Sequence, residues 1–150
     1  MNYENYRLET KNRSFLVIRL FMVLVLVKLP KGEMFISTNE LHLSLVIESL
    51  FDNTNKFTDS GSVTLKIKLD KAQSKLRIEV TDTGCGIPEE YQQSIFQPFF
   101  RVDKSRSREY GGAGLGLSLV WEIANLHGGS VWVEESSEKG TTIAVELPVQ

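Results

Sequence analysis

Two glycine-rich turns contain the residues whose types and spacing point most clearly to chemistry. The first turn reads T-D-T-G-C-G-I-P over residues 81–88 and places Asp82 just before two glycines. Glycines let the backbone approach a flat ligand closely. A carboxylate at that point accepts a hydrogen bond from an exocyclic amine such as that of adenine. Because an ordinary Asp-Gly turn has the same composition, Asp82 needs supporting residues elsewhere.

The second turn reads G-G-A-G-L-G-L over residues 111–117 and precedes a helical pattern. Backbone N–H groups at a helix N-terminus, approached through glycines, are suited to phosphate oxygens. No Gly-Lys-Ser/Thr follows, so the turn is not a P-loop. No βαβ unit surrounds the turn, so it is not a dinucleotide-binding fingerprint either.

A basic and aromatic segment joins the two turns. Arg101, Lys104, Arg106 and Arg108 give it local positive charge in a chain whose net charge is −2. Such groups neutralise phosphates through charge-assisted hydrogen bonds, although a solvated loop has the same composition. We expect Phe96, Phe99 and Phe100 to anchor the segment by packing, and residues 97–112 to form a lid over the ligand.

A helix predicted from about residue 39 to residue 57 supplies further polar groups. Thr38 and Asn39 are good N-cap residues. The helical spacing places Ser49, Asn53 and Lys56 on one face. An asparagine oxygen is a suitable Mg²⁺ ligand, and the lysine is within reach of a phosphate. An isolated asparagine on a helix is usually just exposed, so this prediction depends on the glycine turns.

The remaining pattern predicts an α+β fold in which a mixed, mostly antiparallel sheet carries its helices on one face, forming a two-layer α/β sandwich. A second long helix is predicted over about 115–127, with Leu117, Val120, Trp121 and Ala124 facing the core. The predicted strands are 6–10, 22–29, 63–69, 76–80, 131–133 and 143–147, with a short helix starting near Pro88 and a helix over 14–21.

Length and composition limit the possible functions. The chain has 150 residues, 24% of them charged, which suits one domain over 1–150. The net charge of −2 gives no reason to expect nucleic acid as a partner. One cysteine excludes an intrachain disulfide. The apolar run over 15–29 contains Arg19 and Lys28 and is shorter than a membrane-spanning helix. We expect it to be a helix or strand pair buried in the fold, with a membrane-associated segment as the alternative.

Taken together, the motifs resemble the ATP-binding catalytic domain of bacterial sensor histidine kinases, in the gyrase–Hsp90–histidine kinase–MutL superfamily. The N box resembles S-L-F-D-N-T-N-K-F-T (49–58), the glycine boxes 82–88 and 111–117, and the phenylalanine box I-F-Q-P-F-F-R-V-D (95–103). L-H-G-G (126–129) and G-T-T-I (140–143) match the closing segment. The match covers about residues 38–150, whereas residues 1–30 match poorly.

The resemblance implies the Bergerat-type ATP-binding fold, ATP and Mg²⁺ as cofactors, and Asn53 as the metal ligand. It also implies that Asp82 accepts from the adenine amine and that Thr141 supports the adenine site. It assigns no certain catalytic residue. The implied nucleotide-binding residues are Asn53, Lys56, Phe57, Asp82, Gly84, Gly86, Ile87, Arg101, Gly112, Gly114, Leu115, Gly116, Leu117 and Thr141.

By the same resemblance, the function is donation of the γ-phosphate of ATP to a histidine on a separate helical phosphoacceptor domain, with a response regulator downstream. The catalytic domain is cytoplasmic in this family, and the parent protein is expected to be membrane-associated. The chain lacks the phosphoacceptor hairpin, and its histidines, His42 and His127, are expected to be structural. It also has Ser49 where the family usually has asparagine and Thr54 where it has alanine. Two alternatives therefore stay open: a degenerate nucleotide-binding or docking module, and a superfamily protein-serine kinase.

Overall fold

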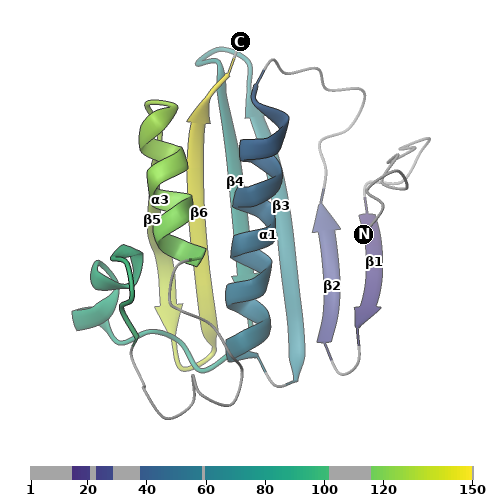
Figure 1. Cartoon of the computed structure of the whole chain (residues 1–150). Helices are drawn as coiled ribbons and strands as arrows, with labels where there is room; N and C mark the ends of the chain where they lie inside the picture. The colour runs from purple at the N-terminus through teal and green to yellow at the C-terminus, as the bar shows by residue number, and fades with distance from the viewer. Residues whose placement is uncertain (1–14, 21–22, 29–37, 59, 102–115, 150) are drawn as a thin grey trace.

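The computed structural model describes residues 15–20, 23–28, 38–58, 60–101 and 116–149. For 15–20, 23–28 and 55–57 only the backbone is described. Predictions that fall elsewhere, including the strand over 6–10 and most of the lid, lie outside the described residues. In the described part, six strands form one sheet in the order β1-β2-β3-β4-β6-β5. Figure 1 shows two long helices, α1 and α3, in front of it.

The bounds of the elements agree with most of the sequence predictions. The helices are α1 (Glu40–Phe57) and α3 (Gly116–Leu126), and two short 3₁₀ turns, η1 (Glu89–Tyr91) and η2 (Ser94–Phe96), follow the first glycine turn. The strands are β1 (Phe15–Leu20), β2 (Val23–Lys28), β3 (Gly61–Asp70), β4 (Lys75–Asp82), β5 (Ser130–Ser137) and β6 (Gly140–Pro148).

The helix predicted over 14–21 is wrong. Residues Phe15–Leu20 form β1, which pairs antiparallel with β2 from Phe15↔Lys28 to Leu20↔Val23. The run is apolar almost throughout, so neither the helical nor the strand period stands out in it. Its β-branched residues, and its pairing with the valine-rich β2, fit a strand.

In the described residues, no helix is long and apolar enough to cross a membrane.

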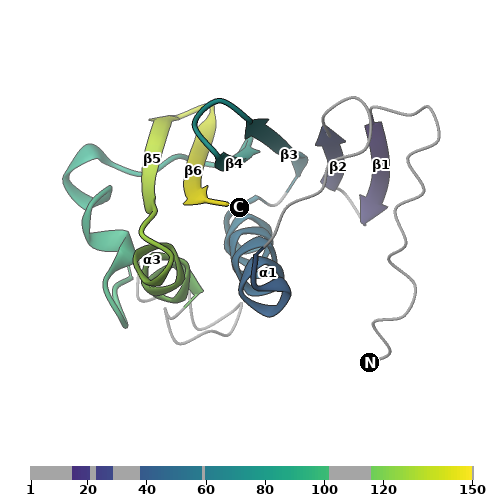
Figure 2. The same ribbon diagram turned by 90° about the horizontal axis from the view of Figure 1, so that it is seen from above.

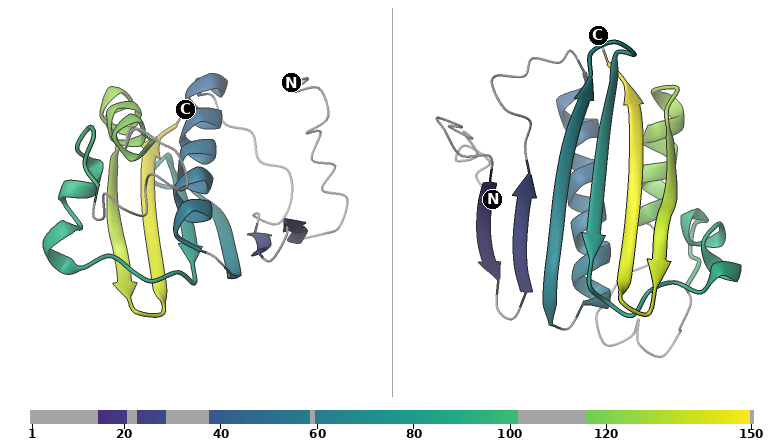
Figure 3. Two further views of the ribbon diagram at one scale, coloured as in Figure 1. Left: turned by 60° about the horizontal axis from the view of Figure 1, so that its bottom comes forward. Right: turned by 180° about the vertical axis from the view of Figure 1, so that it is seen from behind.

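Strand pairing is mixed, as predicted. β2 lies parallel to β3, with α1 between them in the sequence, and the other pairs are antiparallel. Seen from above, both long helices cover the same face of the sheet (Figure 2). Figure 3, right, shows the other face, over which no described helix lies. The two-layer α+β fold is therefore confirmed.

The core lies between the sheet and the helices. Alternate residues of β4 and β6 point into it and meet buried residues of both helices. The fully buried core side chains include Val46, Leu50, Val63, Leu76, Ile78, Val80, Val120, Val145 and Leu147. Trp121 was predicted to face the core but is 44% exposed. Ile123 is buried instead, because it lies three residues after Val120 and so falls on the inner stripe of α3.

The upper end of the sandwich in Figure 1 is held by local hydrogen bonds. The Asn39 side chain accepts from the backbone N–H of His42 and caps α1. The rings of His42 and His127 meet there, with Nδ1 and Nε2 2.9 Å apart. This pair connects the start of α1 to the residue that follows α3.

Candidate functional site

Asp82 is the centre of the candidate site, at the lower end of the sandwich in Figure 1. It is the last residue of β4 and follows the inward alternation of Leu76, Ile78 and Val80. The strand period therefore brings a carboxylate to the end of the apolar core. Its side chain is 7% exposed. A buried carboxylate of this kind needs partners or a ligand.

Two backbone N–H groups meet the same oxygen of Asp82. Gly84 N donates to Oδ1 at 2.8 Å, and Thr141 N donates to Oδ1 at 3.3 Å. Burial raises the pKa of the Asp82 carboxyl, and these two N–H groups act in the opposite direction without cancelling the effect. Among the described residues Oδ2 receives no hydrogen bond, so it can accept from a ligand.

Thr141 lies beside Asp82 because β6 pairs with β4 in register, Asp82 opposite Thr141. It begins the inward series of β6 that continues through Ile143 and Val145, and it is 5% exposed. The structure thus brings together a carboxylate and a hydroxyl from two residues that are 59 positions apart in the sequence.

A hydrogen bond connects the first glycine turn to the β5–β6 hairpin. The N–H of Ile87 donates to Ser136 Oγ at 2.7 Å, and Gln92 Nε2 donates to the Ile87 carbonyl at 3.1 Å. Gly86 has φ +78°, and a Cβ there would lie 2.0 Å from the carbonyl oxygen of Ser137. Only glycine fits this close backbone approach. Gly84 is therefore held against Asp82, and Ile87 is connected to it through Ser136 and Thr141.

Gly116 and Leu117 begin α3 beside α1. A Cβ built on Gly116 would be 3.8 Å from the carbonyl oxygen of Ser49, one helical turn before Asn53. Asn53 is half-buried, and among the described residues its side chain makes no hydrogen bond. An unpaired amide oxygen is a hard donor of the kind that Mg²⁺ accepts, so the residue fits the predicted metal role.

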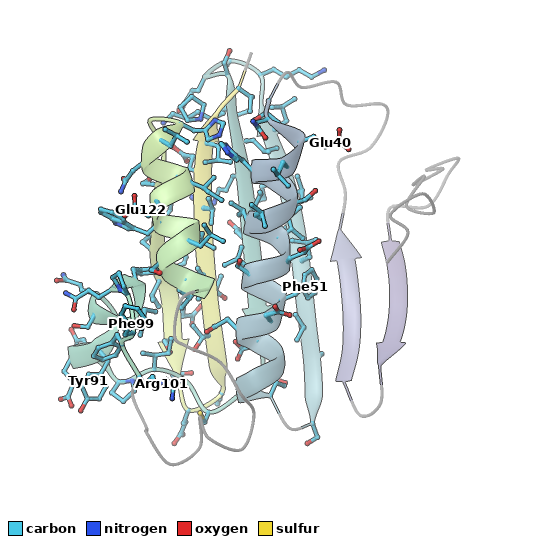
Figure 4. The ribbon with its side chains drawn as sticks, viewed as in Figure 1. Glu40, Phe51, Tyr91, Phe99, Arg101 and Glu122 are labelled. Atoms are coloured by element: carbon cyan, nitrogen blue, oxygen red, sulfur yellow. The ribbon has the colours of Figure 1, made fainter. Side chains whose placement is uncertain are left out.

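For several predicted site residues, the structure describes only the backbone or does not describe the residue. The side chains of Lys56 and Phe57 are not described, and neither are Gly112, Gly114 and Leu115. Arg101 is half-buried at the edge of the described segment, near Tyr91 and Phe99 in Figure 4.

The prediction that Phe99 anchors this segment is wrong. Phe96 and Phe100 pack against the core, and Phe100 contacts Tyr91 with ring centroids 5.8 Å apart. Phe99 is 71% exposed and has φ +63°. Three nearby phenylalanines cannot all face one core surface in a turn that reverses direction at Phe99.

Sequence reasoning missed Ser136. Its hydroxyl lies 2.9 Å from Thr141 Oγ1 and also accepts from Ile87. Its signal was the two-residue turn at Glu138–Lys139, which pairs Ser137 with Gly140 and therefore Ser136 with Thr141.

Comparison with known proteins agrees with this geometry. Residues 38–150 match the family described as histidine kinase-, DNA gyrase B- and HSP90-like ATPases. The sensor histidine kinase WalK of Bacillus subtilis is 36% identical over 121 residues, which are 80% of this chain and 20% of WalK. The histidine-protein kinase ArlS of Staphylococcus aureus is 47% identical over 94 residues, 63% of this chain and 21% of ArlS.

Solved structures give the same result. Full-length ShkA in complex with AMPPNP matches with a TM-score of 0.67 and 30% identity, covering 76% of this chain and 23% of ShkA. The catalytic domain of the histidine kinase ThkA matches with a TM-score of 0.62 and 30% identity, covering 74% of this chain and 68% of that domain. The chain thus spans about a fifth of the curated relatives' length, and it belongs to the histidine kinase-, DNA gyrase B- and HSP90-like ATPase family as a sensor histidine kinase catalytic ATPase domain.

Proposed function

We propose that this chain binds Mg-ATP at the lower end of the sandwich and donates the γ-phosphate to a histidine on a separate helical domain. The observation that carries this proposal is the buried pair of Asp82 and Thr141, which offers an acceptor next to a hydroxyl where the first glycine turn begins. The AMPPNP complex of ShkA, a structural relative, supports a nucleotide as the ligand.

In this proposal Asp82 Oδ2 accepts from the adenine amine, and the backbone at Gly84, Gly86 and Ile87 lines the base. The N-terminus of α3 would direct its backbone N–H groups towards the phosphates. Bound Mg²⁺ neutralises phosphate charge and orients the transferring group. Asn53 would hold it, with Lys56 and Arg101 meeting the phosphates. Positioning and charge neutralisation supply most of the catalysis in phosphoryl transfer.

The phosphoacceptor is proposed to lie outside this chain. The only histidines of the sequence are His42 and His127, and they hydrogen-bond to each other through Nδ1 and Nε2. The pair joins the start of α1 to the residue after α3, at the end of the sandwich opposite to Asp82. Neither ring therefore faces the proposed γ-phosphate. A response regulator would then receive the phosphoryl group, and the parent protein would be a membrane-associated sensor with this domain in the cytoplasm.

Calorimetric titration tests the nucleotide site. We expect ADP and AMPPNP to bind at micromolar concentration, with Mg²⁺ strengthening AMPPNP binding. Asn53→Ala should remove the Mg²⁺ dependence while leaving ADP binding without metal nearly unchanged. No heat at millimolar nucleotide would contradict the proposal.

Radiolabelled ATP tests the transfer. The chain alone should form no acid-labile phosphohistidine, and adding a helical phosphoacceptor domain from a sensor kinase should produce it on that domain. Label on serine, or on His42 or His127, would contradict the proposal.

A degenerate docking module is the second candidate, and Ser49 is the observation that favours it. Serine stands where the family usually has asparagine, and it lies 9% exposed beside Gly116. Nucleotide titration separates the two candidates, because a degenerate docking module would bind nucleotide weakly or not at all.

A further inference from the structure

Ser136 occupies a position between the two halves of the proposed base site. It is on β5, opposite Thr141 on β6. A β-bulge lies between Val133 and Glu135 and shifts the register. Strict alternation from Val131 and Val133 would place Glu135 on the inner side of the strand, and the extra residue places Ser136 there instead. Bulges re-aim side chains in this way next to functional sites.

The hydrogen bonds around Ser136 form a directed chain. It starts at the N–H of Ile87, which is an obligate donor, and reaches Ser136 Oγ at 2.7 Å. The Ser136 and Thr141 hydroxyls are 2.9 Å apart. A hydroxyl that accepts a hydrogen bond becomes a better donor, because hydrogen bonds in series polarise one another. The chain therefore runs most favourably from Ile87 through Ser136 to Thr141.

Either direction leaves one hydroxyl proton without an acceptor among the described residues, and the direction decides which side chain holds it. If Thr141 donated to Ser136, Ser136 would accept twice and its own proton would meet no acceptor among the described residues. If Ser136 donates to Thr141, the one remaining hydroxyl proton belongs to Thr141. Thr141 is 5% exposed and stands beside Asp82, so that proton is available to a ligand bound there.

We propose that Ser136 is a positioning residue that makes the Thr141 hydroxyl a hydrogen-bond donor to the base and so favours six-amino purines over six-oxo purines. The inference rests on the proposed function, since it requires a purine against Asp82 and Thr141. Adenine presents an amine donor next to the ring nitrogen N1, an acceptor. Asp82 and Thr141 then match it as acceptor and donor.

Guanine presents the reverse pattern, a carbonyl oxygen next to a protonated N1. Its carbonyl would face the Asp82 carboxylate, and its N1–H would require Thr141 to accept. Thr141 would then have to donate to Ser136, against the direction set by Ile87. Asp82 gives most of the discrimination, and Ser136 adds the contribution of one hydrogen bond.

The test compares ADP with 1-deaza-ADP, in which a C–H replaces N1, by calorimetric titration of the whole chain. We expect the chain to bind ADP roughly two- to tenfold more tightly than 1-deaza-ADP, the value of one net hydrogen bond. In Ser136→Ala this ratio should approach one. Ser136→Thr keeps the hydroxyl and should keep the ratio, and GDP should gain on ADP in Ser136→Ala.

Ser137→Ala is the matched control. It lies in the same hairpin and removes a side-chain bond to Lys139 N at 3.2 Å, away from Thr141, so the ratio should not change. Thr141→Val keeps the backbone N–H to Asp82 and must also bring the ratio to one, which guards against loss of folding in the alanine variant. An unchanged ratio in either variant, or a ratio of one in the unmodified chain, would overturn this inference alone. Absence of ADP binding in the unmodified chain would overturn the proposed function as well.

Discussion

We expect Asp82→Asn to abolish tight nucleotide binding while leaving the fold at least as stable. The hydrogen bonds at Oδ1 fix the orientation of the new amide. Gly84 N and Thr141 N both donate to this atom, at 2.8 and 3.3 Å, so the amide oxygen must stay there. The NH₂ group then takes the place of Oδ2 and faces the ligand. A donor would meet the donor amine of adenine.

The loss in affinity follows from this reversal. A hydrogen bond to a charged group contributes about 1.5–3 kcal/mol. Losing it weakens binding by a factor of roughly 10 to 150. The new amide NH₂ and the adenine amine would face each other as two donors without an acceptor between them, so a loss of affinity in the upper part of this range is expected. ADP binding in the micromolar range would move towards millimolar.

Stability should change in the opposite direction. Burial raises the pKa of Asp82 above its ordinary 3.8. The folded state therefore binds this proton more tightly than the unfolded state, and ionisation at neutral pH costs folding free energy. The asparagine removes that cost. As pH falls through the raised pKa of Asp82, the unmodified chain recovers the lost stability, so the advantage of the variant should shrink and vanish below about 3.8.

Urea unfolding at several pH values between 7 and 4, together with ADP titration at pH 7, measures both effects. Asp70→Asn is a control for changing a carboxylate to an amide, because Asp70 is the exposed last residue of β3 and accepts from Ala72 N and Gln73 N at 3.0 Å. ADP binding within threefold of the unmodified chain would refute the assigned role of Asp82. A variant that is less stable at pH 7, with the deficit constant in pH, would refute the reasoning about burial.

Three further perturbations test the packing that positions the site. Gly140→Ala should destabilise the fold by about 2 kcal/mol or more in urea unfolding, because residue 140 has φ +136° and its new Cβ would lie 1.9 Å from the carbonyl oxygen of Asp82 in β4. Gly128→Ala is the control: residue 128 has φ +72°, its Cβ would meet nothing within 4 Å, and the change should cost only about 1 kcal/mol. A double-mutant cycle on His42 and His127, each changed to alanine, should give a coupling of about 0.5–1.5 kcal/mol, and additive effects would contradict the hydrogen bond between them. Glu79→Gln should lower the free energy of unfolding by up to about 1 kcal/mol at pH 7. Burial acts to raise the pKa of the Glu79 carboxyl, but the arginine and lysines beside it lower this pKa overall, so the stability that the carboxylate contributes is lost as pH falls through the lowered pKa. An equal loss of stability at pH 7 and at pH 2 would contradict this reasoning.

Much of the fold could be predicted because local patterns and tertiary structure agree. The alternation of β4 and β6 identified the inward residues, and its continuation to Asp82 and Thr141 brought the central pair of the site together. The N-cap at Asn39 marked the start of α1. These features depend on periodicity and capping, which act over a few residues.

The sequence predictions failed where a segment has no hydrophobic period, or where the local backbone turns one side chain away from the face that the pattern suggests. The run Phe15–Leu20 is apolar on both faces, so its pairing with β2 decided the structure. Phe99 is exposed in a left-handed turn conformation that its residue type does not suggest. Ser136 faces inward because of a bulge that the residue pattern of β5 does not reveal, so only counting back from the Glu138–Lys139 turn identifies it.

The order of the strands has a consequence for synthesis on the ribosome. β6 is the last strand in the sequence, yet it lies between β4 and β5. A growing chain that has emerged only as far as β5 leaves the β4 edge unpaired and keeps Asp82 away from Thr141. The proposed base site therefore cannot form until residues 140–148 have left the ribosome tunnel. Nucleotide should therefore not assist folding before that point, and the β4 edge stays without its β6 partner in the interval.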